Sequence, residues 1–239
     1  MDILLLNIQM GHFIVLEGLD GAGKSTQIEL LLQHLQAKEG RVQFVHFPRT
    51  SEGGVFGDLI ARFLRGEFGA ADQVHPQLVA LLFAEDRKAF APNIREWLHE
   101  GYTVVADRYV LSNIAFQCAK LAEKSEKETL TNWIIDFEFN YNQLPAPDIS
   151  LYLDVPFDFV AGSLTKAREG ESRAYLQGKK DIHESDLSFQ QAVKNEYDRL
   201  CAGDFNLRKI DCSDATGAMI GAEQVHAAIA AAVDDVTGR

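Results

Sequence analysis

The stretch Gly18-Leu19-Asp20-Gly21-Ala22-Gly23-Lys24-Ser25-Thr26 decides the fold of this chain. It fits the pattern G-x-x-x-x-G-K-[S/T], in which backbone N–H groups converge on phosphate oxygens. Glycine permits this path because it has no Cβ and tolerates positive φ. Lys24 then reaches the β- and γ-phosphates, and the Ser25 hydroxyl binds Mg²⁺. The pattern predicts that residues 18–26, called the phosphate loop below, bind ATP.

The sequence on either side of the phosphate loop supports this interpretation. Residues 13–16 form an apolar run typical of a buried strand, and apolar residues recur at helical spacing from Ile28 until Gly40 ends the pattern. The alternative is a glycine-rich turn between a strand and a helix that holds no phosphate. The order strand, loop, helix favours the phosphate site, since the helix then points the positive end of its dipole at the anion.

We predict four further strands, at residues 42–47, 102–106, 149–153 and 207–210, and helical patterns separate them. One helical stretch covers residues 77–100, with Pro92 as a break or a fresh start. Alternating strands and helices predict an α/β fold of the P-loop NTPase type: a three-layer sandwich with a five-stranded parallel sheet, helices on both faces and a lid segment. No linker or repeat divides the chain, so we expect one domain over residues 1–239.

Net charge and cysteine content limit the kinds of binding partner and the cellular compartment that we expect for this chain. The chain has 239 residues and a formal net charge of −12, which argues against a nucleic-acid polymer or an anionic membrane as partner. The N-terminal apolar run at residues 3–6 is too short to span a bilayer. Three cysteines without a CxxC pair suggest reduced thiols, so we expect a cytoplasmic protein.

Charged residues follow three of the predicted strands, where ligands of such sheets collect. Lys24 follows the first strand, Arg49 the second, and Asp107-Arg108 the third. Arg108 can clamp an acceptor phosphate with two N–H groups, while Asp107 holds Arg108 or a water bound to Mg²⁺. The alternative is an ion pair at the strand end that binds no ligand.

Phe83 and Arg87 are four residues apart and therefore lie on one helical face. This spacing lets an aromatic ring stack on a base while the guanidinium hydrogen-bonds the edge of the base. Alternatively, Phe83 belongs to an apolar stripe with Leu81, Leu82 and Phe90 that packs into the core.

The segment 166–180 carries five basic and two acidic side chains in an otherwise acidic chain, and it contains Gly170 and Gly178. A mobile basic segment of this kind can close over a phosphoryl donor, exclude water and place an arginine on the charge that develops during transfer. The alternative is an ordinary solvated loop.

Taken together, these residues resemble the thymidylate kinase family, whose members pass the γ-phosphoryl group of ATP to dTMP, giving dTDP for dTTP synthesis. The resemblance runs from His12 to about Asp214. Its ordered motifs are residues 13–26 (FIVLEGLDGAGKST), Phe47-Pro48-Arg49, Leu81-Leu82-Phe83 with Arg87, Asp107-Arg108-Tyr109 with Ser112-Asn113 and Phe116, Pro147-Asp148, and Asp154-Val155-Pro156.

The resemblance implies a role for each matching residue. Asp20 would contact the deoxyribose 3′-hydroxyl and help to organise Mg²⁺, and Arg49 and Arg108 would hold the dTMP phosphate. Around the base and sugar, Phe83 would stack on thymine, with Arg87 at O4, Asn113 at N3, Phe116 against the sugar 2′ position and Phe47 lining the pocket.

The lid is expected at about residues 165–184. Some family members carry a catalytic arginine in the phosphate loop, but here that position is Gly21, so the chain is similar to members that use lid arginines, for which we choose Arg168 and Arg173. Asp181-Ile182-His183-Glu184 resembles the family's Asp-x-x-Glu, with Glu184 a partner for Mg²⁺ and His183 at a position that is more often aromatic or arginine. A homodimer is also expected from the family.

Two other functions stay open at this point. An enzyme of the same class with another acceptor, such as a deoxynucleoside, would want a carboxylate base near the sugar 5′-hydroxyl, whereas two arginines favour an acceptor that is already phosphorylated. A nucleotide-dependent switch or regulatory ATPase would need no small acceptor. The sequence contains no Asn-Lys-x-Asp motif for guanine, which argues against the hypothesis that the switch protein is a GTPase.

Overall fold

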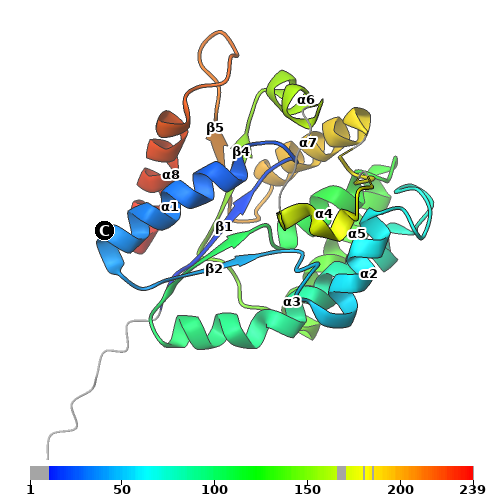
Figure 1. The fold of residues 1–239 in the computed structure, drawn as a ribbon, viewed down its shortest axis with the longest axis horizontal. Coiled ribbons are helices and arrows are strands. Elements are labelled where there is room, and N and C mark those ends of the chain that lie inside the picture. The colour runs from blue at the N-terminus through cyan, green and yellow to red at the C-terminus, as the bar shows by residue number, and fades with distance from the viewer. Residues whose placement is uncertain (1–10, 166–170, 180, 185, 239) are drawn as a thin grey trace, which may run out of the picture.

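A five-stranded parallel sheet forms the centre of the computed structural model, which describes residues 11–165, 171–179, 181–184 and 186–238 (Figure 1). The strands lie in the order β2-β3-β1-β4-β5, and every neighbouring pair is parallel. Their bounds are β1 Phe13–Glu17, β2 Val42–His46, β3 Thr103–Asp107, β4 Ile149–Asp154 and β5 Leu207–Asp211. All five predicted strands are therefore confirmed.

Helices cover both faces of the sheet. On one face α1 packs against α8, and on the other α3, α4 and α7 lie together (Figure 1). The described helices are α1 Lys24–Glu39, α2 Gly54–Leu64, α3 Pro76–His99, α4 Val110–Cys118, α5 Lys124–Ile135, the π-helix η1 Asp136–Tyr141, α6 Phe157–Thr165, the 3-10 helix η2 Glu171–Leu176, α7 Leu187–Cys201 and α8 Ala222–Thr237. The predicted three-layer α/β sandwich is confirmed.

Burial explains why the central strands read as unbroken apolar runs. All five residues of β1 and of β3 are buried, because both faces of these strands are covered by helices. The edge strands β2 and β5 are more exposed and more polar.

The predicted break at Pro92 is wrong, because α3 runs without interruption through this residue. A proline inside a helix removes one backbone hydrogen bond. Ala91 and Ile94 on either side of Pro92 are buried in the main core, and this packing holds the helix together across the missing bond.

The parallel sheet sets where the site must lie. The phosphate loop follows β1, Arg49 follows β2, and Arg108 follows β3, so the three segments meet at one edge of the sheet. None of the described helices combines the length and the apolarity that crossing a bilayer demands.

Candidate active site

The phosphate loop has the backbone of an anion site. Gly21 and Gly23 have φ values of 80° and 79°, a left-handed conformation that side chains with a Cβ rarely adopt. Gly23 caps α1 without a side-chain hydrogen bond, and Ser25 and Thr26 at the start of α1 are exposed. The first N–H groups of α1 therefore lack a side-chain cap, which leaves them suited to phosphate oxygens.

Lys24 folds back over the loop that precedes it. Its Nζ donates to the backbone oxygens of Leu19 at 2.9 Å and Gly18 at 3.4 Å. Burial of the ammonium group, reinforced by the nearby charge of Arg108, lowers the pKa of Lys24 to about 8. An anionic ligand would favour the charged form that the free protein disfavours.

Arg108 lies at the end of β3 with a φ of 68°, an uncommon conformation for a residue with a side chain. Its Nη2 donates to Oδ1 of Asp20 at 2.8 Å, and its Nη1 donates to Oγ of Ser112 at 3.1 Å. The guanidinium also lies over the ring of Phe116, 4.9 Å from its centroid. Arg108, Asp20 and Phe116 thus lie together, and a strained backbone of this kind is typical of functional sites. Their contacts with a substrate stay predictions.

Gln190 joins α7 to the phosphate loop, a contact that the sequence did not suggest. Its Nε2 donates to Oδ2 of Asp20 at 2.9 Å and to the backbone oxygen of His183 at 3.0 Å. Burial raises the pKa of Asp20, but the charges of Arg108 and Lys24 and the Gln190 hydrogen bond outweigh it, so the carboxylate is ionised. Through these two hydrogen bonds, Gln190 connects the phosphate loop to the end of the lid.

Glu17 is a second residue that sequence analysis missed. It is fully buried at the end of β1 and accepts hydrogen bonds from the backbone N–H of Tyr109 at 3.0 Å, the Tyr197 hydroxyl at 2.9 Å, and the Ser112 hydroxyl. Burial raises its pKa, against the opposing effect of these hydrogen bonds and of Arg108. Glu17 thus holds the start of α4 against β1. It also positions Ser112, which accepts a hydrogen bond from Arg108.

Asp107 offers an oxygen that suits a magnesium ion. Its Oδ2 lies 3.0 Å from Nδ1 of His46, whereas its Oδ1 is buried without a hydrogen-bond partner in the described chain. Carboxylate and hydroxyl oxygens are Mg²⁺ ligands, and Mg²⁺ on nucleotides keeps several ligands from water and phosphate. The described residues hold no cluster of three or more His, Cys, Asp or Glu that could bind a metal ion.

Asp20 and Glu184, the other two expected partners of Mg²⁺, are placed differently. Both carboxylate oxygens of Asp20 already accept hydrogen bonds, from Arg108 and Gln190. Glu184 is partly exposed at the end of the lid. Their roles toward the metal stay predictions.

Asp86 positions Arg49 and was not singled out in the sequence. The Arg49 Nε donates to Oδ1 of Asp86 at 3.1 Å, and the Arg49 backbone N–H donates to Oδ2 at 2.9 Å. The Arg49 guanidinium lies 4.6 Å from the ring centroid of Phe90. Asp86 directly precedes Arg87, so the charged run 85–88 inside an apolar helix was the available signal.

The residues expected at the base lie on neighbouring helices. Arg87 of α3 is 2% exposed and Asn113 of α4 is 3% exposed, and both bind the carboxylate of Glu138. Phe83 is partly buried against a second, smaller core cluster that includes Phe63 of α2. Core packing of Phe83 is therefore present, and its stacking on a base stays a prediction.

Phe47 is 1% exposed and belongs to the main core, where it contacts the rings of Phe90 and Tyr109. The structure thus gives Phe47 a packing role, and its contact with a substrate stays a prediction.

An apolar pocket adjoins the phosphate loop on the side of α8. Its lining comes from the start of α1, from Phe159 of α6 and from the segment before and within α8: Ala22, Gly23, Thr26, Gln27, Phe159, Met219, Ile220, Ala222 and Val225. Sequence analysis missed this pocket because its walls are about 200 residues apart in the chain and show no shared motif.

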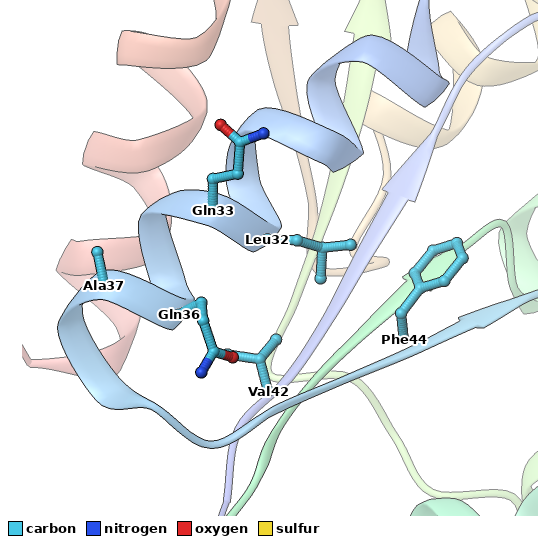
Figure 2. Close-up of a pocket in the computed structure, with 6 residues that line it drawn as sticks. All are labelled: Leu32, Gln33, Gln36, Ala37, Val42 and Phe44. Atoms are coloured by element: carbon cyan, nitrogen blue, oxygen red, sulfur yellow. The ribbon is translucent and has the colours of Figure 1, made fainter.

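A second groove lies between α1 and β2 (Figure 2). Six residues line it, and none of them carries a charge: Leu32, Gln33, Gln36, Ala37, Val42 and Phe44. This groove is on the outer edge of the sheet, away from the phosphate loop. A nucleotide whose phosphates bind the loop would therefore place its base in the pocket beside the loop and not in this groove.

The described part of the lid packs on α2. Arg65 donates to the backbone oxygen of Tyr175 at 2.6 Å. The backbone N–H of Ile182 donates to the backbone oxygen of Leu64 at 3.0 Å. Arg168 lies outside the described residues, and Arg173 lies in η2 with a side chain that the structure does not describe. Their catalytic roles stay predictions.

Asp181 is expected to make the folded protein sensitive to pH. It is buried, and its oxygens accept hydrogen bonds from the Tyr175 hydroxyl and the His183 backbone N–H, both at 2.8 Å. Burial, with the charge of Asp20, raises the pKa of Asp181 from 3.8 to about 7. Because the folded-state pKa exceeds the unfolded one, the stabilisation from protonated Asp181 is complete below pH 3.8 and is lost as pH rises through 7.

Asp181→Asn is therefore expected to raise the unfolding temperature at pH 8 and to change it little at pH 4. Thermal unfolding of the free protein at both pH values measures this difference. An equal change at the two pH values would show that Asp181 does not titrate in this range.

The phosphate loop and the five-stranded parallel sheet define a class of protein, the nucleotide-binding proteins with a P-loop NTPase fold. The family model for thymidylate kinase matches residues 16–220, and the chain belongs to that family. It is similar to a probable thymidylate kinase of Pyrococcus horikoshii, with 30% identity over 225 residues that cover 93% of this chain and 96% of the relative. The thymidylate kinase of Mycobacterium tuberculosis is 36% identical over 191 residues, covering 79% of this chain and 85% of the relative.

A solved structure of thymidylate kinase from Candida albicans superposes with a TM-score of 0.68 at 25% identity, covering 95% of this chain and 92% of that one. The family resemblance and the fold class predicted from the sequence are both confirmed.

Proposed function

We propose that the cleft at the carboxyl ends of β1, β2 and β3 holds ATP and dTMP head to head and transfers the γ-phosphoryl group to dTMP. The observation that carries this proposal is the convergence of Lys24, Arg49 and Arg108 on that edge. Two nucleotides that meet through their phosphates repel each other, and cationic groups from separate segments offset this repulsion.

Arg108 and Arg49 are assigned to the phosphate of dTMP. Each is held by a buried or partly buried carboxylate, Asp20 and Asp86 respectively, so each guanidinium is oriented before the acceptor arrives. Two oriented arginines favour a monophosphate over an unphosphorylated nucleoside.

The base and sugar contacts that we propose are those implied by the family resemblance, and residues of α3 and α4 make most of them. Arg87 is assigned to thymine O4 and Asn113 to N3, with Phe83 stacked on the ring. Phe116 lies beneath Arg108 and is assigned to the sugar 2′ side, where it disfavours ribonucleotides. Asp20 is assigned to the 3′-hydroxyl.

The donor nucleotide is assigned to the phosphate loop, with its base in the apolar pocket between α6 and α8. Ser25 and the free Oδ1 of Asp107 are the residues that fit Mg²⁺, and the bound ion neutralises phosphate charge. Lys24 contacts the β- and γ-phosphates, and Arg168 and Arg173 are proposed to cover the transferring group. Orientation of the two substrates supplies roughly 7–11 kcal/mol, so we assign no general base.

Assembly and location are also proposals. We propose a homodimer, as expected from the family, and a single kinase domain, which the continuous sheet and its helix layers support. A reducing compartment such as the cytoplasm fits the three free cysteines, two of which are buried.

A screen of acceptors tests the proposed function. ADP release is measured with dTMP, dUMP, dCMP, dGMP and dAMP, and we expect dTMP to give the highest kcat/KM. A clear preference for thymidine over dTMP would contradict the assignment of the acceptor, and slow ATP hydrolysis that no monophosphate stimulates would indicate a regulatory ATPase.

Arg87→Ala is expected to reduce the preference for dTMP over dCMP by about 10–100-fold, because the donor to O4 is lost. The preference is measured as a ratio of kcat/KM values. Arg95→Ala on the same helix is the control, since Arg95 is exposed and donates to the backbone oxygen of Gln143. A loss of equal size for all five monophosphates would contradict the base contact.

A further inference from the structure

Glu138 is a buried carboxylate on the π-helix η1, and nothing in the local sequence marks it. It is 0% exposed, and η1 continues directly from α5. A charged group this deep in a protein needs partners that compensate for the loss of water. Its partners are two residues that the proposed function places at the base of the acceptor.

Arg87 and Asn113 both donate to Glu138. The Arg87 Nε and Nη2 donate to Oε2 and Oε1 of Glu138, each at 2.6 Å, which is the parallel two-bond geometry of arginine and carboxylate. The Asn113 Nδ2 donates to the same Oε1 at 2.9 Å. One carboxylate thus connects α3, α4 and η1.

These contacts fix the orientation of the Asn113 amide. Its Nδ2 also donates to the backbone oxygen of Ala80 at 3.0 Å. Both neighbours of Nδ2 are acceptors without a proton to give, so the amide cannot be flipped without placing oxygen against oxygen. Oδ1 is then left buried, with no hydrogen-bond partner in the described chain. A buried acceptor without a donor is a place where a ligand can supply one.

The same carboxylate also restricts Arg87. It engages Nε and Nη2 and leaves Nη1 outside the pair. Nη1 of Arg87 and Oδ1 of Asn113 are then the donor and the acceptor that these contacts leave for a ligand. Thymine offers the complementary pair, an acceptor at O4 and a donor at N3, whereas cytosine carries an amino donor at C4 and an acceptor at N3.

We propose that Glu138 is a positioning residue for base selection: it orients Arg87 and Asn113 so that the site accepts the 4-oxo, N3–H edge of thymine and rejects the edge of cytosine. This inference rests on the proposed contacts of Arg87 and Asn113 with the base. Glu138 acts through those two residues, so it is not itself a catalytic residue.

Glu138→Gln tests the proposal while keeping the size of the side chain. The substitution replaces one carboxylate oxygen by an NH₂ group, so Arg87 loses one of its two acceptors and the anchor that it shares with Asn113 is weakened. We expect the ratio of kcat/KM for dTMP over dCMP to fall at least about tenfold, with a rise in KM for dTMP larger than the fall in kcat.

Glu196→Gln is the matched control. Glu196 of α7 is also a buried carboxylate with two cationic partners, Lys127 at 2.7 Å and Arg199 at 2.7 Å, and these three residues bind one another on the α5 side of α7. We expect Glu196→Gln to lower the unfolding temperature and to leave the dTMP/dCMP ratio unchanged. If Glu138→Gln behaves in the same way, Glu138 has only a structural role and the proposal is overturned.

Two further measurements keep the outcome decisive. Glu138→Asp is the substitute if Glu138→Gln is insoluble. It keeps the negative charge but draws it back from Arg87 by one methylene, so we expect this variant to fold and to lose part of the dTMP/dCMP ratio. In a double-mutant cycle with Asn113→Ala, adding the Glu138 substitution should reduce the ratio by less than it does alone, because both act through one amide. Full additivity would contradict the proposal.

The wild-type protein separates this inference from the proposed function. A wild type without preference for dTMP over dCMP would refute the proposed base contacts themselves. A wild type with that preference, and a Glu138→Gln variant that retains it, would refute the role of Glu138 alone.

Discussion

Arg108→Ala is expected to lower kcat/KM on the order of 10³-fold for every nucleoside monophosphate that the enzyme accepts. The substitution removes the guanidinium that lies between Asp20 and Ser112 over the ring of Phe116. The acceptor phosphate is common to all monophosphates, so the loss should not depend on the base. Steady-state ADP release with dTMP and dCMP measures it.

Arg108→Gly separates the loss of the guanidinium from backbone strain. The φ of 68° at this position suits glycine, so the glycine variant should be the more stable of the two and should lose as much activity. Arg199→Ala is a control, because Arg199 binds Glu196 away from the cleft. A loss confined to dTMP, with dCMP unaffected, would place Arg108 at the base and contradict the phosphate assignment.

Lys24→Met is expected to lower kcat at least about 10³-fold, because it removes the cation that we assign to the transferring phosphoryl group. The same change should not destabilise the free protein at pH 7. Burial and Arg108 lower the pKa of Lys24 from 10.5 to about 8, so the folded protein without ligand holds the charge at a cost of a few kcal/mol. Activity is followed by ADP release and stability by urea unfolding.

The pH dependence of stability checks the Lys24 assignment. Between pH 8 and 10.5 the unfolded chain binds more protons at Lys24 than the folded one, so the contribution of Lys24 to the stability of the wild type should rise with pH in this window. The Met variant should lack this rise. Lys127→Met is the control, since Lys127 is a partly buried lysine paired with Glu196. A wild type and Met variant with parallel pH curves would show that Lys24 is not desolvated.

Local patterns accounted for the architecture. The central strands β1 and β3 were visible as apolar runs, because strands buried on both faces need apolar side chains at every position. The error at Pro92 has the opposite origin, since the continuity of α3 depends on the packing of Ala91 and Ile94 and not on the local preference of proline.

The positioning of the site depended on contacts between distant residues. Arg49 and Asp86 are 37 residues apart, Arg87 and Glu138 are 51 apart, and Asp20 and Gln190 are 170 apart. No period or motif of the sequence connects such pairs, because they are joined by the order of strands in the sheet and the packing of helices on it.

The sequence by itself determined the phosphate loop, the alternation of strands and helices, and the edge of the sheet where Lys24, Arg49 and Arg108 emerge. These features depend on backbone freedom at glycine and on local apolar periodicity, both of which are written in neighbouring residues. Only the tertiary structure decided which carboxylate orients each arginine and that the Oδ1 of Asn113 is left without a donor. The pairing of buried charges is set by which side chains the fold excludes from water together, and that requires the whole chain.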